Sequence, residues 1–243
     1  MRIDVLTIFP KMLESPFSES LIARAIKNKI IELNIIDIRS FSKDRHKKVD
    51  DNPFGGGAGM VLKLEPIVSA LKSIGVRKKN KFYKNSYKKP LVIYMSPQGK
   101  TLNASIIKNL SKFNHLAIVC GHYEGIDERI MNFIDTEISI GDYVLTGGEI
   151  PAMVLIDSVA RMIPGVVKER ESIINDSFYN GLLDYPHYTR PAVLGKLKTP
   201  AVLLSGDHKK IEKWRKQQSF IRTRKRRPDL IKKYNLEIKE LTK

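Results

Sequence analysis

Two glycine-rich loops, each preceded by a short apolar run, constrain the fold of this chain most strongly. Leu116–Cys120 leads into the first loop, Gly121–Gly125, and Ile134–Ile140 leads into the second, Gly141–Gly148. Glycine lets a backbone adopt positive φ angles and approach a ligand closely. Together with a further loop at Ser96–Gly99, they indicate a ligand site built largely from main chain at strand ends. The alternative, for either loop alone, is a tight turn that simply needs glycine.

Strand-like and helix-like segments alternate along the first 163 residues. Apolar or β-branched runs predict strands at Arg2–Phe9, Ile30–Ile38, Pro90–Met95, His115–Cys120 and Ile134–Ile140. Apolar residues at helical spacing predict helices at Ser20–Lys29, Glu65–Ile74, Asn103–Phe113, Ile126–Asn132 and Pro151–Met162. We expect Thr101 or Asn103 to cap the third of these helices and Pro151 to be the first residue of the last. The alternation predicts an α/β fold with a mostly parallel sheet, which binds ligands at the carboxyl ends of its strands.

Two segments interrupt this pattern. Asn52–Met60 holds four glycines after a charged stretch, and we expect a mobile loop or a closing lid there. Ser96–Lys100 is predicted to be a turn. The predicted domains are an α/β domain at 1–163, a flexible linker with a substrate loop at 164–190, and a basic, mainly helical domain at 191–243.

The tail from about Asp207 has the pattern of a helix. One face of this helix is predicted to hold Ile211, Trp214, Gln218 and Ile221, with lysine and arginine on the other faces. We interpret Trp214 as a core residue rather than a stacking platform for a base.

The charge is strongly basic and unevenly distributed. The chain has 43 Lys and Arg against 26 Asp and Glu, a net charge of +17. Residues 208–233 hold twelve basic residues against two acidic ones, and residues 77–89 hold seven against none. Such runs favour a polyanionic partner, nucleic acid first, over a compositional drift without meaning, which would be spread evenly.

Cysteine content and hydropathy indicate a cytoplasmic protein. The single cysteine, Cys120, lies in an apolar run and is expected to be a buried, inert thiol in a reducing compartment. The first ten residues do not resemble a signal peptide, and no apolar run approaches the roughly 18 residues that a membrane span needs.

The sequence excludes several common kinds of ligand site. A P-loop would need glycine where Tyr94 stands before Gly99-Lys100-Thr101, and Gly55–Gly59 lacks the preceding strand of a dinucleotide site. One cysteine and five scattered histidines give no zinc-ligand pairs, so we predict no metal held by the protein alone. Two carboxylates, Asp176 and Asp184, lie in a tyrosine-rich segment where they could face a nucleobase. Spacing alone favours the alternative, in which Asp176 caps a turn and Asp184 is solvated.

Long motifs resemble those of one family. They are Gly-His-Tyr-Glu-Gly-Ile-Asp at 121–127, Ser-Ile-Gly-Asp-Tyr-Val-Leu-Thr-Gly-Gly-Glu at 139–149 and Gly-Leu-Leu-Asp-Tyr-Pro-His-Tyr-Thr-Arg-Pro at 181–191. They closely resemble the bacterial tRNA (guanine-N1)-methyltransferases, which belong to the SPOUT class with a deep trefoil knot. The resemblance covers essentially the whole chain. It implies that S-adenosylmethionine binds in the knot, at Tyr94, Ser96, Pro97, Gly121, Tyr123, Glu124, Ile140, Gly141, Tyr143, Leu145, Gly147, Gly148 and Pro151.

The resemblance also implies the reaction and its residues. Asp176 matches the general base that takes the N1 proton of guanine, and Arg161 matches its partner, which would stabilise charge at O6. Asp184 matches a contact to the target guanosine, the guanine at tRNA position 37 with a guanine before it. One departure is His122, where many relatives carry arginine.

The partners implied are tRNA and a second copy of the chain, because family members are homodimers with an active site shared between subunits. Arg222 and Arg224 are candidate contacts to phosphates, which position RNA without reading its sequence. Magnesium dependence is an expectation for the family that no residue here demonstrates. A non-catalytic RNA-binding SPOUT protein and a methyltransferase for a different RNA are the alternatives, and the presence of both Arg161 and Asp176 favours an enzyme.

Overall fold

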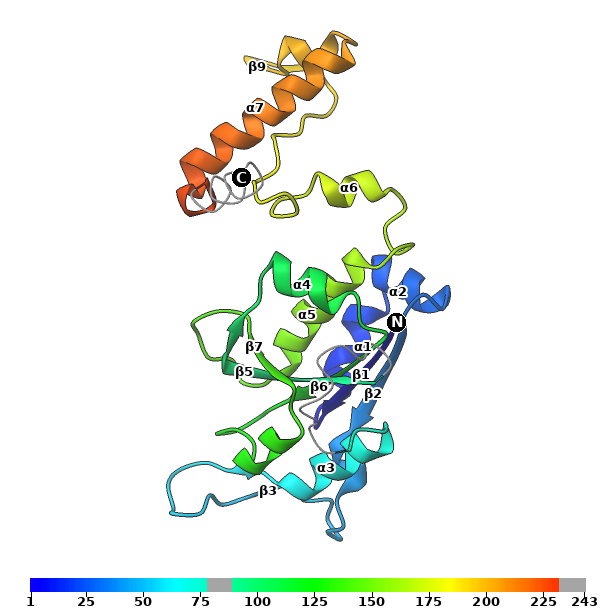
Figure 1. Ribbon diagram of the computed structural model, residues 1–243, viewed down its shortest axis with the longest axis vertical. Helices are drawn as coiled ribbons and strands as arrows, with labels where there is room; N and C mark the ends of the chain where they lie inside the picture. Colours follow the sequence, from blue (N-terminus) through cyan, green and yellow to red (C-terminus); the bar gives the residue numbers. More distant parts are fainter. Residues whose placement is uncertain (78–88, 232–243) are drawn as a thin grey trace, which may run out of the picture. The chain divides into compact units, whose positions relative to one another are not determined.

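The computed structural model describes residues 1–77 and 89–231 (Figure 1). The chain divides into two compact units, Met1–Lys168 and Glu169–Lys243, which are described one at a time. The basic run at 77–89 lies largely outside the described residues, as does the end of the predicted helical domain. Among the described residues, no helix combines the length and apolar character that crossing a bilayer requires.

The first unit is built on one parallel sheet, as predicted. Its strands, in the order β2-β1-β6-β5-β7, pair in parallel throughout. They are β1 (Arg2–Thr7), β2 (Glu32–Asp37), β5 (Leu91–Thr101), β6 (His115–Cys120) and β7 (Thr136–Ser139). Parallel strands need crossover connections, which helices and loops supply here.

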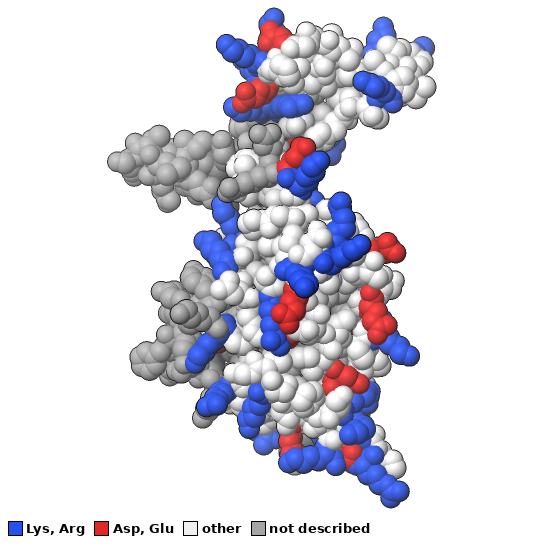
Figure 2. Space-filling view, turned by 90° about the vertical axis from the view of Figure 1, so that its right-hand side faces the viewer, with Lys and Arg blue, Asp and Glu red and all other residues white. Residues whose placement is uncertain are grey.

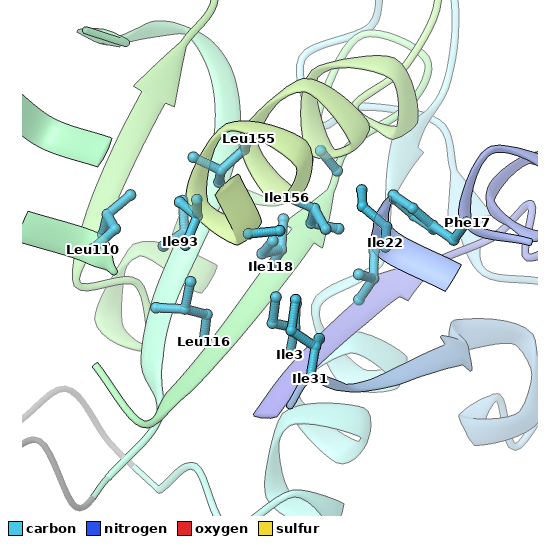
Figure 3. Close-up of a cluster of buried hydrophobic side chains, with 14 of the residues drawn as sticks. Ile3, Phe17, Ile22, Ile31, Ile93, Leu110, Leu116, Ile118, Leu155 and Ile156 are labelled. Carbon is cyan, nitrogen blue, oxygen red and sulfur yellow. The ribbon is translucent and has the colours of Figure 1, made fainter. Parts of the chain in front are cut away.

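Alternation along the central strands sends apolar side chains to both faces of the sheet. Ile3 and Val5 of β1 join one buried cluster, whereas Leu6 joins the other. Figure 3 shows the first cluster, where strand residues meet Phe17, Ile22 and other helix residues. Two apolar faces explain why strand segments of this chain are almost continuously apolar.

Helices cover both faces. One face carries α1 (Lys11–Phe17), α2 (Ser20–Lys27) and α5 (Glu149–Met162). The other carries the short helix η1 (Ile38–Phe41), α3 (Leu64–Ser73) and η2 (Glu128–Asn132). A further helix, α4 (Ala104–Leu110), packs against α5. The unit therefore has three layers, the arrangement expected of an α/β fold.

Several predicted elements need correction. β5 does not end at Met95, because it continues to Thr101 through the segment predicted as a turn. Its register against β7 shifts between Met95 and Lys100, so the predicted turn is a bulge within one strand. The helix predicted from Pro151 begins at Glu149, and Pro151 sits in its first turn, where a missing N–H breaks no helical bond. Asn103, not Thr101, caps α4, since its side chain accepts from the Ile106 N–H.

The segment between Pro10 and Ser20 forms α1, which the sequence analysis does not predict. The helix spans seven residues, contains Pro16 and has two buried residues, Leu13 and Phe17, four positions apart. So short a pattern is too weak to recognise, and packing on the sheet stabilises the helix instead.

Asn52–Met60 is held between two short strands, β3 (Asp50–Asp51) and β4 (Val61–Leu62). The base of this loop is attached to the first glycine-rich loop. The Leu62 N–H donates to the Gly125 carbonyl at 3.0 Å, and the Glu124 N–H donates to the Met60 carbonyl at 3.1 Å. A closing movement of this loop stays a prediction. The carboxyl end of the loop lies beside the predicted cofactor residue Glu124.

A buried carboxylate lies in β1, toward the amino ends of the strands. Asp4 is fully buried and contacts His115 Nε2 at 2.6 Å, Asn34 Nδ2 at 2.8 Å and Arg2 Nε at 3.1 Å. Burial raises the pKa of Asp4, but the hydrogen bonds from His115, Asn34 and Arg2 together lower it by more, so the pKa lies below its ordinary value.

The second unit contains one long helix, α7 (His208–Arg226), which the sequence predicts. Asp207 caps it by accepting from the Lys210 N–H at 3.1 Å. The predicted apolar face is wrong at Ile221, which is 54% exposed, and Thr223 is fully buried instead. Shorter elements precede this helix: α6 (Arg170–Ile174), β8 (Val193–Leu194), β9 (Leu197–Lys198) and η3 (Ala201–Leu204).

Described basic side chains are dispersed over the face seen in Figure 2. Figure 2 shows lysine and arginine over much of the visible face of both units, with acidic side chains interspersed. Clustering in sequence therefore does not produce a single patch on this face.

Candidate active site

The predicted cofactor residues lie in β5 up to and within its bulge, in the loops that follow β6 and β7, and at the start of α5. Because β5 pairs with β6 on one side and β7 on the other, the ends of these three strands are neighbours. The fold thus brings together Tyr94, Ser96 and Pro97 from β5, Gly121, Tyr123 and Glu124 from the first loop, and Ile140, Gly141, Tyr143, Leu145, Gly147, Gly148 and Pro151 from the second loop and α5.

Backbone contacts join the two glycine-rich loops. The Gly148 N–H donates to the Gly121 carbonyl at 2.8 Å, and His122 forms an antiparallel bridge with Gly147. A Cβ on Gly148 would lie 2.8 Å from Cys120 Cα, and one on Gly147 would collide with the side chains of His122 and Glu149. At Gly148 glycine is therefore required because the backbones of the two loops pack against each other, a reason different from ligand approach. At Gly147 the added carbon would meet side-chain ends rather than backbone.

Tyr94 packs against the first loop. A Cβ on Gly121 would meet its hydroxyl at 2.9 Å. Burial, with a smaller contribution from the charges of Glu137 and Glu128, raises the pKa of Tyr94 to about 12. The hydroxyl therefore stays protonated near neutral pH and remains able to donate a hydrogen bond.

Apolar side chains at the loop surfaces remain accessible. Tyr123 is 46% exposed, Tyr143 55% and Leu145 37%. Tyr123 also has a φ of 59°, a left-handed conformation that is uncommon for a residue with a side chain. Such backbone strain concentrates at ligand sites, so it supports a binding role for this loop.

Glu149, at the start of α5, connects the second loop to the centre of the sheet. It is fully buried, and its Oε1 accepts from Thr7 Oγ1 at 2.6 Å. Its Oε2 lies 3.6 Å from His122 Nε2. Beside it, burial and then the charge of Glu149 raise the pKa of the Cys120 thiol, which fits the expected inert cysteine. Glu149 is not among the site residues predicted from the sequence. The signal for it in the sequence is a carboxylate that follows two glycines at the start of a helix.

The two predicted catalytic residues lie in different units. Arg161 is exposed in the last turn of α5, on the face that also carries Ile150, Val154 and Asp157. Asp176 is half-buried just after α6, and its N–H donates to the Ile173 carbonyl at 3.3 Å. Each unit is placed by itself, so a joint action of the two residues stays a prediction.

Asp184 belongs to a bonded cluster in the second unit. Its carboxylate accepts from the Tyr185 N–H at 2.7 Å and lies 2.6 Å from His187 Nε2. The interpretation of Asp184 as merely solvated is therefore wrong. Its carbonyl accepts from Arg222 Nη1 at 3.4 Å, whereas Arg224 is exposed on α7.

Aromatic residues lie close to this cluster. The Arg215 guanidinium lies 5.0 Å from the centre of the Tyr185 ring, within the range of a cation–π contact. Trp214 is half-buried and lies 6.4 Å from the Tyr188 ring. Trp214 thus packs within its own unit, as expected of a partly buried core residue.

A parallel sheet with its loops gathered at the carboxyl ends of adjacent strands defines a ligand-binding α/β protein. Comparison with known proteins identifies the family. The model of the family described as tRNA (Guanine-1)-methyltransferase TrmD matches residues 1–233. The chain belongs to this tRNA (guanine-1)-methyltransferase family of the SPOUT class, and the match spans most of both units. The knot itself remains a prediction.

Relatives from several bacteria support the assignment. The tRNA (guanine-N(1)-)-methyltransferase of Endomicrobium trichonymphae is 70% identical over 233 residues, 96% of this chain and 100% of that protein. Those of Ruminiclostridium cellulolyticum and Fusobacterium nucleatum are 57% and 54% identical, over 96% and 100% of this chain and 97% and 94% of their own lengths. The chain is therefore an enzyme of a methyltransferase family that acts on tRNA, and methyltransferases of this kind use S-adenosylmethionine in general.

Proposed function

We propose that this chain methylates N1 of guanine at position 37 of tRNA, next to the anticodon, with S-adenosylmethionine as methyl donor. The observation that carries the proposal is the family match over residues 1–233, which includes both Arg161 and Asp176. The bulge of β5 and the two glycine-rich loops that follow β6 and β7 supply a location for the donor.

The loop residues fit S-adenosylmethionine chemically. The exposed faces of Tyr123, Tyr143 and Leu145 offer apolar surface for a purine ring. The backbone of the glycine-rich loops offers N–H and C=O groups for the edges of the ring and the ribose. When bound, S-adenosylmethionine supplies an electrophilic methyl group on its sulfonium. The protein then has to hold the guanine and move one proton.

Asp176 and Arg161 carry the proton chemistry in this proposal. Guanine N1 carries a proton at neutral pH, and removing it places negative charge on N1 and O6. The carboxylate of Asp176 accepts this proton, a contribution of about 10²–10⁴-fold in rate. The guanidinium of Arg161 stabilises the charge on O6 with paired donors.

A homodimer is part of the proposal, because the family resemblance implies an active site shared between two subunits, with Arg161 and Asp176 supplied by different units. Four apolar side chains on α5 and near α1, Phe9, Met12, Ile150 and Val154, are 37–45% exposed, and α1 contacts α5. An exposed apolar face of this kind is typical of a subunit interface. Arg161 shares the exposed face of α5, so a second copy covering the apolar residues would approach Arg161 too.

The linker at 164–190 and the basic helical part at 191–243 bind tRNA in this proposal. Asp184 contacts the target guanosine, while Arg222 and Arg224 contact phosphates, which position the RNA. The reaction is cytoplasmic, where tRNA is available. A Mg²⁺ requirement belongs to the proposal as a family expectation, and removal of the ion with EDTA followed by its readdition tests it.

Methyl transfer to defined transcripts tests the function. Labelled S-adenosylmethionine is incubated with unmodified tRNA transcripts that have or lack guanine at position 37, followed by nucleoside analysis. We expect label in 1-methylguanosine from the first transcript alone. Label in another nucleoside, or none in a protein that binds the donor, would contradict the proposal and favour a different RNA or a non-catalytic role.

A further inference from the structure

One carboxylate connects three segments that are distant in sequence. Thr7 Oγ1 donates to Glu149 Oε1 at 2.6 Å and itself accepts from the Phe9 N–H at 2.8 Å. Glu149 Oε1 is thus held in a fixed direction by the end of β1. Glu149 Oε2, by contrast, is buried and has no hydrogen-bond partner among the residues that the structure describes.

The ionisable group that faces this oxygen is the imidazole of His122. Its Nε2 lies 3.6 Å away, slightly beyond hydrogen-bond distance. The ring is held on one side by Phe9, at 4.7 Å between ring centres, and contacts Tyr123 at 5.5 Å. His122 is part of the first loop and Glu149 directly follows the second, so the pair spans both.

An unpaired buried carboxylate is costly, because several kcal/mol of hydration are lost when it leaves water. The start of α5 offsets part of this cost through its dipole. A protonated His122 would supply the missing charge-assisted donor to Oε2. The required movement is small, since the two atoms need to approach by only about 0.5 Å to reach ordinary hydrogen-bond distance.

We propose that Glu149 is a positioning residue for the cofactor site, acting through His122: the charged imidazole pairs with Glu149 Oε2 and holds the loops Gly121–Gly125 and Gly141–Gly148 together. This inference rests on the proposed function for the identity of the ligand, S-adenosylmethionine. Neither side chain needs to touch the ligand, because both act on the backbone that surrounds it.

The pairing depends on the charge of His122, and histidine is the side chain that ordinarily changes charge between pH 5 and 8. The titratable groups around this pair are Glu149 itself, Tyr123, whose ring contacts His122, and the Cys120 thiol from β6, whose pKa the charge of Glu149 influences. Burial raises the pKa of Cys120, so that thiol stays neutral. Among these groups, Glu149 is therefore the one anionic neighbour of a charged His122. Because the pairing holds the two loops together, the affinity for S-adenosylmethionine should rise as pH falls.

Calorimetric titration of the full-length protein with S-adenosylmethionine at about pH 6 and pH 8.5 tests this inference. We expect the Kd of the unchanged protein to be about tenfold lower at the acid end, equivalent to one paired charge worth ~1.4 kcal/mol. His122→Arg keeps the positive charge at both pH values, so its Kd should not depend on pH in this way. His122→Gln and Glu149→Gln should bind weakly at both. In methyl-transfer assays over a range of donor concentrations, the changes should appear in the KM for S-adenosylmethionine rather than in kcat.

Two outcomes would overturn the inference: a Kd of the unchanged protein that does not vary with pH, or a His122→Arg variant with the same variation. If Glu149→Gln does not fold, the comparison of the unchanged protein with His122→Arg still decides the question. If S-adenosylmethionine does not bind at any pH, the proposed function fails. The pairing of His122 with Glu149 is then tested by thermal unfolding. The unchanged protein must have a higher Tm at the lower pH, and His122→Arg must lack this difference.

Discussion

Gly148→Ala tests how closely the two glycine-rich loops must pack. Gly148 has a φ of −81°, which alanine adopts without strain, so the backbone does not oppose the change. The added carbon, however, would lie 2.8 Å from Cys120 Cα and 2.9 Å from the Gly121 nitrogen. These are backbone atoms of β6 and its loop, and no rotation of a side chain can relieve the clash.

The magnitude follows from the distances. Favourable carbon–carbon contacts begin at about 3.5 Å, so the start of α5 must move by roughly 0.7 Å. Such a movement stretches the hydrogen bond from the Gly148 N–H to the Gly121 carbonyl, now 2.8 Å, toward its limit. Overpacking costs ~1–3 kcal/mol and the weakened bond ~0.5–1.5, while alanine lowers the entropy of the unfolded chain and returns ~0.4–1. We expect a net loss of about 2 kcal/mol.

The assay combines thermal unfolding with titration of S-adenosylmethionine. In a unit of this size a loss of about 2 kcal/mol corresponds to a fall in Tm of about 4–8 °C. The Kd should rise about tenfold, equivalent to ~1.4 kcal/mol. Gly206→Ala is the control for binding alone. Its φ of 71° strains alanine, but no atom lies within 4 Å of its added carbon and it belongs to the second unit, so its Kd should not change. A Gly148→Ala protein with unchanged Tm and Kd would refute the reasoning.

Three further changes address other parts of the molecule. Asp176→Asn keeps the size of the side chain but removes its basicity, so turnover should fall about 10²–10⁴-fold with donor binding retained, and near-normal turnover would exclude Asp176 as the base. Arg224→Ala combined with Lys225→Ala removes two exposed charges of α7. The slope of the logarithm of the tRNA-binding constant against the logarithm of salt concentration should fall by about one for each phosphate that is no longer bound. An unchanged slope would exclude a phosphate-binding role for this pair. The lowered pKa of Asp4 stabilises the fold above the ordinary carboxyl pKa of about 4, and this stability is lost as pH falls through the lower folded pKa. Asp4→Asn should therefore lower the free energy of unfolding in urea at pH 7 and flatten its decline toward about pH 3, and an equally steep decline would contradict this.

Local patterns predict much of the first unit. Apolar runs and their alternation locate the five strands of the sheet, and the spacing of apolar residues locates α2, α3 and α5 to within a few residues. Asp207 and Asn103 mark helix starts because a short polar side chain satisfies free N–H groups at that point. These signals depend on residues a few positions apart, which a single sequence contains in full.

Other features depend on partners far along the chain. β5 continues to Thr101 because β7 pairs with it beyond the bulge, and Ile221 faces solvent because Thr223 binds the 183–185 segment instead. Neither partner can be recognised from the spacing within β5 or α7. The sequence-based errors occur at these places for that reason.

By itself, the sequence determined the alternation of strands and helices, the basic tail and, through its long motifs, the family. Only the tertiary structure decided why Gly148 must be glycine and which partners Glu149 has. The hydrogen bond between Thr7 and Glu149 joins residues 142 positions apart. It exists because β1 and β6 are neighbours in the sheet, and the order of strands is set by the packing of the whole unit rather than by any segment of it.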